Sequence, residues 1–300
     1  MGHKNKVSLV KQVQDVLDSK LCIGESKQQA KIMGIAQDGI YSWGTYKSYI
    51  KHLCYFVDYC KNEHRCKTID QCRQYADEWL ASRKSLSPYT QKMERSALCK
   101  LYGCRSTDFK VEIDARTYDK VSRSRGEAVR DKHFSVTNNA DLVEFASSTG
   151  LRRAELEALR GTDLILTRYG QWRINITRGS KGGRNRIVPI VGNTNLVVRI
   201  MQAAGNNKVF HAVPSAMDVH SYRAIYAQRL YDRLARPLDI CRADRTFKQP
   251  GKEFCDYDAV YWRRGAHKGE WMDKRAMLMV SRALGHNRIS VAGEHYLFDK

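Results

Sequence analysis

Five short stretches in the second half of the chain carry residue types that could act together on one phosphate group. In chain order they contribute Arg152, Lys181, His220 with Arg223, His286 and Tyr296. A phosphodiester is a poor electrophile because its negative charge repels a nucleophile, so fixed cationic donors must supply much of the catalysis. The planar fork of arginine suits two phosphate oxygens, whereas lysine offers a point charge. A tyrosine hydroxyl, with a pKa of about 10, attacks near neutral pH only with a base or a cationic pocket beside it.

Each stretch also has an ordinary structural reading. Arg152 lies at the start of an expected helix, where backbone N–H groups favour an anion, but an arginine at a helix start is usually a surface residue. Lys181 lies at the tip of a glycine-rich hairpin, where lysines are usually solvated. His220 and Arg223 are three residues apart on an expected helix and would share one face. The order of all five stretches within one domain is therefore more informative than any one of them.

That order resembles the tyrosine recombinase (phage integrase) family. The most specific stretches are Gly-Leu-Arg-x-x-Glu-Leu-x-x-Leu at 150–159 and Leu284-Gly285-His286, and the match covers about 137–297. The helical first part is similar in type to the SAM-like core-binding domain of that family. The resemblance implies a site-specific DNA recombinase, an integrase of a phage or other mobile element, that cuts and rejoins DNA through a 3′-phosphotyrosyl intermediate.

The resemblance also implies a role for each residue. Tyr296 would attack the phosphate and release a 5′-hydroxyl, and Lys181 would protonate that leaving oxygen. Arg152 and Arg223 would neutralise the non-bridging oxygens. His220 would assist proton transfer, and His286 would donate a hydrogen bond to the phosphate. Glu155 would brace the first arginine. The implied partners are double-stranded DNA, a homo-tetramer on paired sites and accessory DNA-bending proteins, with no membrane, no metal, no cofactor and no ATP.

Two other functions share these features. A type IB topoisomerase-like enzyme would use the same chemistry to relax any supercoiled plasmid without paired sites. A catalytically inactive DNA-binding relative would keep the domain but not the reaction. The presence of a suitable residue type at all five positions argues against such decay.

The chain departs from the family pattern in three places. The interval from His286 to Tyr296 is ten residues, one more than usual, so the approach of the tyrosine depends on a local adjustment. The 63 residues from Arg223 to His286 predict an insertion around 237–268. Its basic residues could grip DNA or a neighbouring protomer, and they are Arg242, Arg245, Lys248, Arg263 and Arg264. Only 297–300 follow the tyrosine, so either the insertion replaces a C-terminal tail or the chain is truncated.

Composition supports a nucleic-acid partner. The 300 residues include 52 Lys and Arg against 32 Asp and Glu, a net charge of +20, and the pI is about 9.6. Such a basic chain favours binding to a polyanion, and nucleic acid is the commonest polyanion. No apolar run is long enough for a transmembrane helix and no secretory signal is evident, so we expect a cytoplasmic protein, associated with the nucleoid when bound to DNA.

Hydrophobic periodicity predicts a mainly α-helical protein with a small antiparallel β-sheet. We expect a helical core-binding domain at 1–105, a basic interdomain linker at 106–132 and an α+β catalytic domain at 133–300. The expected first-domain helices are 8–20, 26–37, 42–61, 68–82 and 87–102. The second domain is expected to contain helices at 137–148, 153–159, 194–204, 218–235 and 274–283, and strands at 164–168, 172–177 and 186–190.

Basic residues outside the five stretches are candidate DNA contacts, although any one of them is more often a solvated surface charge. They are Lys47, Lys51, Arg83, Lys84, Lys92 and Arg95 in the first domain and Arg123 and Arg125 in the linker. The aromatic residues of the first domain recur at helical spacing and are expected in packing rather than in base stacking. The nine cysteines form no Cys-x-x-Cys pair, and their six-residue spacing from Cys54 to Cys72 does not suit zinc, so we expect reduced thiols.

Overall fold

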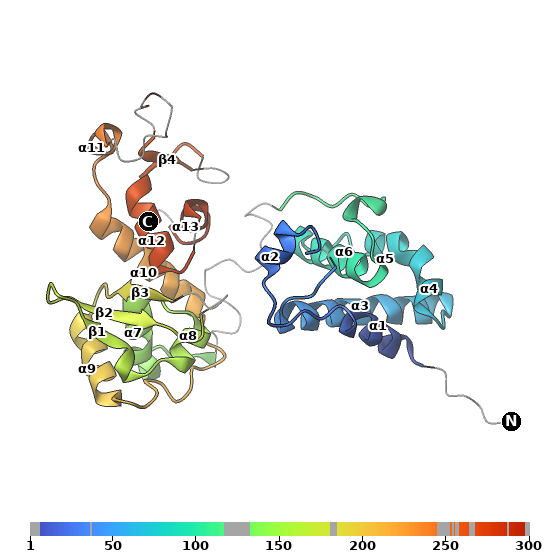
Figure 1. The fold of residues 1–300 in the computed structure, drawn as a ribbon, viewed down its shortest axis with the longest axis horizontal. Helices are drawn as coiled ribbons and strands as arrows, with labels where there is room; N and C mark the ends of the chain where they lie inside the picture. The colour runs from blue at the N-terminus through green and yellow to red at the C-terminus, as the bar shows by residue number, and fades with distance from the viewer. Residues whose placement is uncertain are drawn as a thin grey trace. The chain divides into compact units, whose positions relative to one another are not determined.

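The protein divides into two compact units, Met1–Ser122 and Arg123–Lys300 (Figure 1). The computed structural model describes residues 7–36, 38–116, 133–180, 185–244, 253, 255, 258–263, 268–286 and 288–297. The division between the units falls within the segment 106–132 that the sequence predicts as a linker, of which 117–132 lie outside the described residues.

Unit 1 is mainly helical in its described part. Its helices are α1 (Leu9–Asp18), α2 (Lys27–Ile32), α3 (Trp43–His64), α4 (Ile69–Cys72), α5 (Ala76–Ser82) and α6 (Pro88–Tyr102). Five of them start where a hydroxyl accepts a backbone N–H three residues further on, and these N-cap residues are Ser8, Ser26, Ser42, Thr68 and Ser87. Such caps satisfy N–H groups that lack partners within the helix, so the helix starts were predictable from the sequence and are confirmed.

Two helices of unit 1 differ from the prediction. Helix α2 ends at Ile32 instead of reaching residue 37, because the chain turns at Gly34 with a φ of 77° that few other residues adopt. The segment expected as one helix from 68 to 82 is broken by a 3₁₀ turn at Arg73–Tyr75. There the Tyr75 ring stacks on His64 with a centroid distance of 3.6 Å.

The core of unit 1 forms where α1, α3, α5 and α6 pack together. Leu53, Phe56 and Leu98 are completely buried in it, and Trp79 is 2% exposed. Phe56 therefore packs as expected, and Tyr46, Tyr49 and Tyr59 are partly buried against this core, although Trp43 and Tyr55 remain exposed.

Unit 2 combines helices with two small antiparallel sheets. Its helices are α7 (Ala140–Thr149), α8 (Arg153–Ala158), α9 (Thr194–Ala204), α10 (Val219–Leu234), α11 (Leu238–Ala243), α12 (Lys274–Ala283) and α13 (Ile289–His295). The first sheet has the order β1 (Leu164–Leu166), β2 (Trp172–Ile176) and β3 (Arg186–Pro189), with Ile174 opposite Leu164 on one side and Val188 on the other. This is the predicted meander, so the fold class is confirmed.

The core of unit 2 lies between this sheet and the helices α7, α10 and α12. Phe145 and Tyr226 are completely buried, and Gly150 ends α7 with a φ of 60°. A Cβ at Gly150 would lie 2.2 Å from the Tyr226 ring, so the junction between α7 and α8 requires glycine. This junction fixes where α8, and hence Arg152, begins.

A second sheet was not predicted. Strands β4 (Val260–Trp262) and β5 (Trp271–Asp273) pair antiparallel, with Trp262 opposite Trp271. Their rings meet edge to face at a centroid distance of 4.6 Å. Each strand has only three residues, too few for a visible alternation of polar and apolar positions, so tertiary packing decides that β4, within the expected insertion at 237–268, pairs with β5, which follows the insertion.

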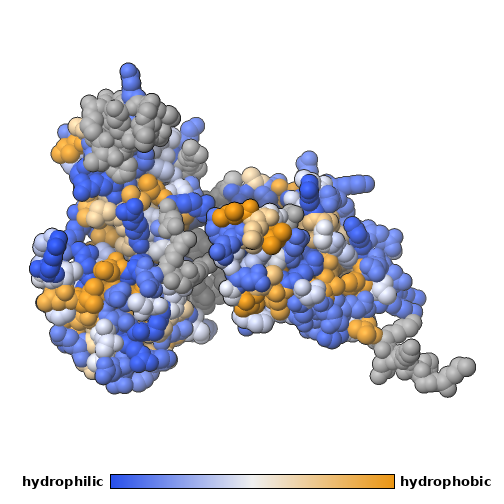
Figure 2. All heavy atoms as spheres, in the orientation of Figure 1, coloured by the Kyte–Doolittle hydropathy of each residue, from blue (hydrophilic) through white to orange (hydrophobic). Residues whose placement is uncertain are grey.

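Hydrophilic side chains cover much of the face of each unit seen in Figure 2, with smaller apolar areas between them. No helix in the described ranges is long and apolar enough to cross a membrane. All nine cysteines lie among the described residues and are free thiols. Within the same ranges no group of three or more His, Cys, Asp or Glu side chains could hold a metal ion.

Candidate active site

A buried carboxylate organises two arginines of unit 2. Glu155 is 1% exposed, and its oxygens accept bonds from Arg186 Nη1 and Nη2, both at 2.7 Å, and from Arg152 Nη1 at 2.9 Å. The backbone N–H of Arg152 adds a fourth bond at 2.7 Å. Burial opposes ionisation of this carboxyl, but the bonds and charge of Arg186, followed by those of Arg152, outweigh burial and lower the pKa of Glu155. Glu155 therefore remains ionised and holds both guanidinium groups.

The turn after α12 supplies carbonyl acceptors for three arginines. The carbonyl of Ala283 accepts from Arg186 Nε at 2.8 Å, and that of Leu284 accepts from Arg152 Nη2 at 2.8 Å and Arg223 Nη2 at 3.0 Å. These carbonyls lie at the negative end of the helix dipole, which favours cations.

Gly285 makes this close approach possible. Its φ is 73°, and a Cβ there would lie 3.0 Å from Arg152 Nη1 and 3.2 Å from Arg186 Nη1. A larger residue would strain the backbone and crowd both guanidinium groups. The Leu-Gly-His sequence therefore has a physical explanation. Its glycine lets the turn approach the arginines, and its histidine is the next residue along the chain.

Arg223 is the most deeply enclosed cation of the site. It is fully buried on α10 and donates from Nη1 to the carbonyl of Gly150 as well as from Nη2 to Leu284. Burial lowers its pKa, and the neighbouring Tyr296 hydroxyl opposes this effect. Its Nε is buried and has no hydrogen-bond partner among the described residues.

Tyr296 lies against this arginine and against His286. It follows α13 directly as its C-cap, its amide donates to the carbonyl of Ala292 at 3.0 Å, and it is 5% exposed. Its ring centroid is 5.5 Å from Arg223 Cζ and 5.6 Å from the His286 ring. The structure thus brings together residues from four separate stretches of the sequence.

His286 is uncharged at neutral pH. Its half-buried position, followed by the positive charges of Arg152, Arg223 and Arg186, lowers its pKa from 6.5 to about 4. Its Nε2 is buried and has no hydrogen-bond partner within the described ranges. His286 can therefore offer a hydrogen bond to a ligand but not a positive charge.

The other two catalytic candidates are His220 and Lys181. His220 is exposed in the first turn of α10, whereas Arg223 one turn later is enclosed, so the two side chains have different environments. The amide of His220 binds the Asp218 carboxylate at 3.1 Å. Lys181 lies outside the described residues.

The DNA-contact candidates of unit 1 fall into two groups. Lys47, Lys51 and Lys84 are exposed, and Arg83, Lys92 and Arg95 are half-buried. Arg83 Nη2 lies 3.0 Å from the fully buried Glu94 carboxylate, so its charge has a partner inside unit 1. Arg123 and Arg125 lie outside the described residues.

Sequence reasoning missed Arg186, although a signal was present. Arg186 alternates with Val188 and Ile190, both of which are buried, so the side chain of Arg186 must point to the same face as this core. A core-facing arginine needs an acidic partner, and Glu155 on the expected helix was available. This reasoning would have predicted the pair from sequence.

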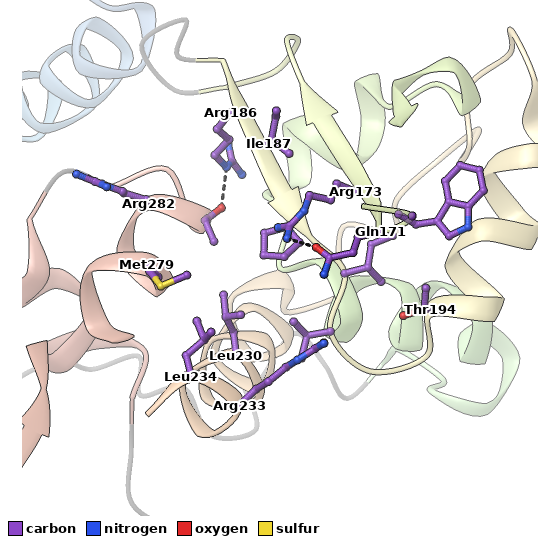
Figure 3. A pocket seen from close by; sticks show the side chains of 16 residues that line it. Gln171, Arg173, Arg186, Ile187, Thr194, Leu230, Arg233, Leu234, Met279 and Arg282 are labelled. Atoms are coloured by element: carbon purple, nitrogen blue, oxygen red, sulfur yellow. Dashed lines mark hydrogen bonds between the residues drawn. The ribbon is translucent and has the colours of Figure 1, made fainter. Parts of the chain in front are cut away.

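Arg186 also forms one wall of a groove of about 750 Å³ between β2, β3, α10 and α12 (Figure 3). Arg173, Arg233 and Arg282 line the same groove, and Leu230 contributes to its apolar floor. Figure 3 shows the bond from Arg186 to the Ala283 carbonyl at its edge. Arg186 therefore belongs both to the groove and to the arginine cluster.

The expectation for the insertion changes at Arg263. The sequence predicts a basic residue that grips DNA or another protomer, but Arg263 is 2% exposed and bonds within unit 2. Among the other basic residues of the insertion, Arg242 is exposed on α11, and Arg245, Lys248 and Arg264 lie outside the described residues.

The chain is similar to an integrase and a recombinase of known structure. The Tn1549 transposon integrase, solved in complex with transposon right-end DNA, aligns over 98% of this chain and 96% of its own, with 12% identity and a TM-score of 0.43. XerA recombinase aligns over 96% of this chain and 94% of its own, with 15% identity and a TM-score of 0.30. No family model and no curated protein matches the chain.

Proposed function

We propose that this chain is a site-specific DNA recombinase of the tyrosine recombinase type, an integrase of a phage or other mobile element. The observation that carries the proposal is the convergence of Arg152, Arg223 and His286 around Tyr296. Four residues whose types suit attack on a phosphodiester meet although they are far apart in the sequence. The order of the same residues in the sequence supports the same conclusion.

The cluster is suited to an anion. Arg152, Arg186 and Arg223 contribute three positive charges against the single negative charge of Glu155, so the site carries a net positive charge. Two of its buried nitrogens, Arg223 Nε and His286 Nε2, have no hydrogen-bond partner among the described residues. Unsatisfied buried polar atoms are costly, and a bound phosphate would supply acceptors for both.

These positions support cleavage of a DNA strand by Tyr296. The Tyr296 oxygen attacks phosphorus, a tyrosyl phosphate ester forms at the 3′ end, the P–O5′ bond breaks, and the 5′-oxygen leaves as a hydroxyl after taking a proton. Arg152 and Arg223 stabilise the charge that develops on the non-bridging oxygens. His286, neutral at the working pH, donates a hydrogen bond to the phosphate.

We assign protonation of the leaving 5′-oxygen to Lys181, which lies in the glycine-rich sequence 179–183 between β2 and β3. His220 is assigned to proton transfer at the tyrosine hydroxyl. Attack by the freed hydroxyl reverses the sequence, and since each step exchanges one phosphate ester for another, rejoining needs no ATP.

We assign double-stranded DNA as the partner of the exposed basic residues. The net charge of +20 and the exposed Lys47, Lys51 and Lys84 of unit 1 support backbone contacts. Recombination between two sites requires four cleavages, so we propose that a homo-tetramer acts on paired sites, with accessory DNA-bending proteins as further partners.

The test is covalent trapping. A pool of nicked duplexes with a random central sequence is incubated with the full chain, and DNA that stays attached in SDS is recovered and sequenced. The unmodified chain should stay covalently attached to DNA, because the short fragment released at the nick cannot attack in reverse. The trapped DNA should belong to one family of sequences, because the proposed recombinase is site-specific. Tyr296→Phe should lose trapping and still bind the recovered duplex.

Tyr169→Phe is the matched control, since Tyr169 is 73% exposed in the same unit, and it should trap DNA normally. Trapping by the Tyr296→Phe variant would show that the nucleophile is wrong. Absence of trapping by the unmodified chain would overturn the reaction. Trapping without sequence preference, together with relaxation of any supercoiled plasmid, would favour the topoisomerase-like alternative.

A further inference from the structure

The hairpin β4–β5 contacts the segment that carries Tyr296 through one buried side chain. Arg263 follows β4 directly and is 2% exposed. Its Nη1 pairs with the Glu270 carboxylate, and its backbone N–H donates to the Glu270 carbonyl at 3.0 Å, so both groups close the hairpin. Its Nη2 leaves the hairpin and donates to two carbonyls of the C-terminal segment.

Those two carbonyls lie on either side of Tyr296. Nη2 is 3.0 Å from the carbonyl of Gly293 and 2.6 Å from that of Leu297. The carbonyls of the last helical turn lack partners within the helix and must be satisfied by other groups. One rigid guanidinium therefore ties the end of α13 to the residue after the tyrosine and fixes the backbone between them.

The packing of the hairpin supports the same contact. Gly293 is enclosed between α12 and β4: a Cβ there would lie 2.8 Å from Met277 Cε and 3.4 Å from Tyr261 Cε1. Helix α13 has only seven residues, fewer than an isolated helix needs to be stable, so its conformation depends on such tertiary contacts.

We propose that Arg263 is a positioning residue that holds the Tyr296 hydroxyl in line with the phosphate through the backbone of α13 and Leu297. This inference rests on the proposed function, because it takes Tyr296 as the nucleophile. It gives the predicted insertion a role inside its own unit. Part of the long interval between Arg223 and His286 then serves to position the nucleophile.

The first test needs no DNA. Arg263→Met keeps the length of an unbranched side chain but removes every donor, and Arg263→Lys keeps one cationic donor group. Amide hydrogen exchange of peptides covering 289–297 is compared among these variants, the unmodified chain and Arg242→Met. Arg242 is the matched control because it is an exposed arginine of the same insertion.

We expect exchange at 289–297 to rise about tenfold or more in Arg263→Met, to rise less in Arg263→Lys, and to stay unchanged in Arg242→Met. Exchange in α7 should not change in any variant, which shows that unit 2 remains folded. Unchanged exchange at 289–297 in Arg263→Met would overturn the contact itself.

The second test separates positioning from stability. Single-turnover formation of the covalent complex is measured at saturating concentrations of the duplex recovered by trapping, together with the DNA concentration that gives half the maximal rate. Misplacement by about 1 Å can slow a reaction 100-fold, so Arg263→Met should react about 10- to 100-fold more slowly at saturation. Its half-saturating DNA concentration should match that of the unmodified chain, and Arg263→Lys should recover part of the rate.

Each outcome has a distinct meaning. A normal saturating rate in Arg263→Met, with faster exchange at 289–297, would show a purely structural contact and refute the positioning role. A loss confined to DNA affinity would place Arg263 in DNA binding and refute it as well. If Tyr296→Phe traps DNA or the unmodified chain does not, the proposed function fails, and the exchange result still reports whether Arg263 orders the segment.

Discussion

Replacing Glu155 by glutamine tests the centre of the arginine cluster most directly. The carboxylate is fully buried and accepts four hydrogen bonds, three from guanidinium nitrogens and one from a backbone N–H. Glutamine keeps one acceptor oxygen but turns the other into an NH₂ group, which would face N–H donors. It also removes the only negative charge that the structure shows bonded to Arg152 and Arg186.

The expected loss can be estimated from this arrangement. Removing one partner of a buried ion pair costs about 3–5 kcal/mol because the other charge remains buried without compensation. That is a large part of the roughly 5–15 kcal/mol by which a domain is stable. With a urea dependence of about 2 kcal/mol per molar, the unfolding midpoint of unit 2 should fall by about 2 M.

The assay is urea unfolding followed by tryptophan fluorescence, since Trp172, Trp262 and Trp271 belong to unit 2. Glu144→Gln is the matched control because Glu144 pairs with Arg229 in the same unit, with about a third of its side chain exposed. Such a surface pair contributes about 0–1 kcal/mol, so the control should barely shift the midpoint. Equal effects of the two substitutions would refute the view that Glu155 organises the cluster.

The pH dependence provides a second check on Glu155. Its pKa is lowered in the folded chain, so its contribution is present above the unfolded-state pKa of about 4.5 and is lost as the pH falls through the folded-state pKa. The difference in stability between the unmodified chain and Glu155→Gln should therefore shrink in acid.

Two further predictions concern the turn that carries His286. Since the pKa of His286 is about 4 in the folded chain and 6.5 when free, the unfolded chain takes up the proton first as the pH falls, so this residue reduces stability between pH 6.5 and 4. Over that pH window His286→Asn should lose less stability than the unmodified chain. The difference should be at most about 1 kcal/mol per pH unit, because the ring is only half-buried. Equal losses of stability in urea unfolding would contradict the lowered pKa of His286. Gly285→Ala should lower the free energy of unfolding by about 1–2 kcal/mol through its positive φ and should also reduce covalent trapping by displacing Arg152. Gly170 has a similar φ of 71°, and a Cβ there would have no atom within 4 Å, so Gly170→Ala should lose stability but still trap DNA. Equal trapping by Gly285→Ala and Gly170→Ala would refute the steric argument.

Much of the fold could be read from the sequence because the signals are local. Each N-cap hydroxyl bonds a backbone N–H only three residues away, so Ser8, Ser42 and Ser87 marked helix starts without knowledge of the tertiary structure. The meander of β1 to β3 followed from short apolar runs separated by turn residues. The candidate residues Arg152, Arg223, His286 and Tyr296 could be proposed because their types and order resemble a known family.

What the sequence could not decide depends on contacts between distant residues. Arg152 reaches the carbonyl of Leu284, 132 positions away, and Arg186 reaches Glu155, 31 positions away. Arg263 looked like a surface cation of an insertion, yet its partners at Gly293 and Leu297 lie 30 and 34 positions further on and bury it. A buried arginine is stable only where acceptors surround it, and only the packing of α12, α13 and the two sheets brings those acceptors into place.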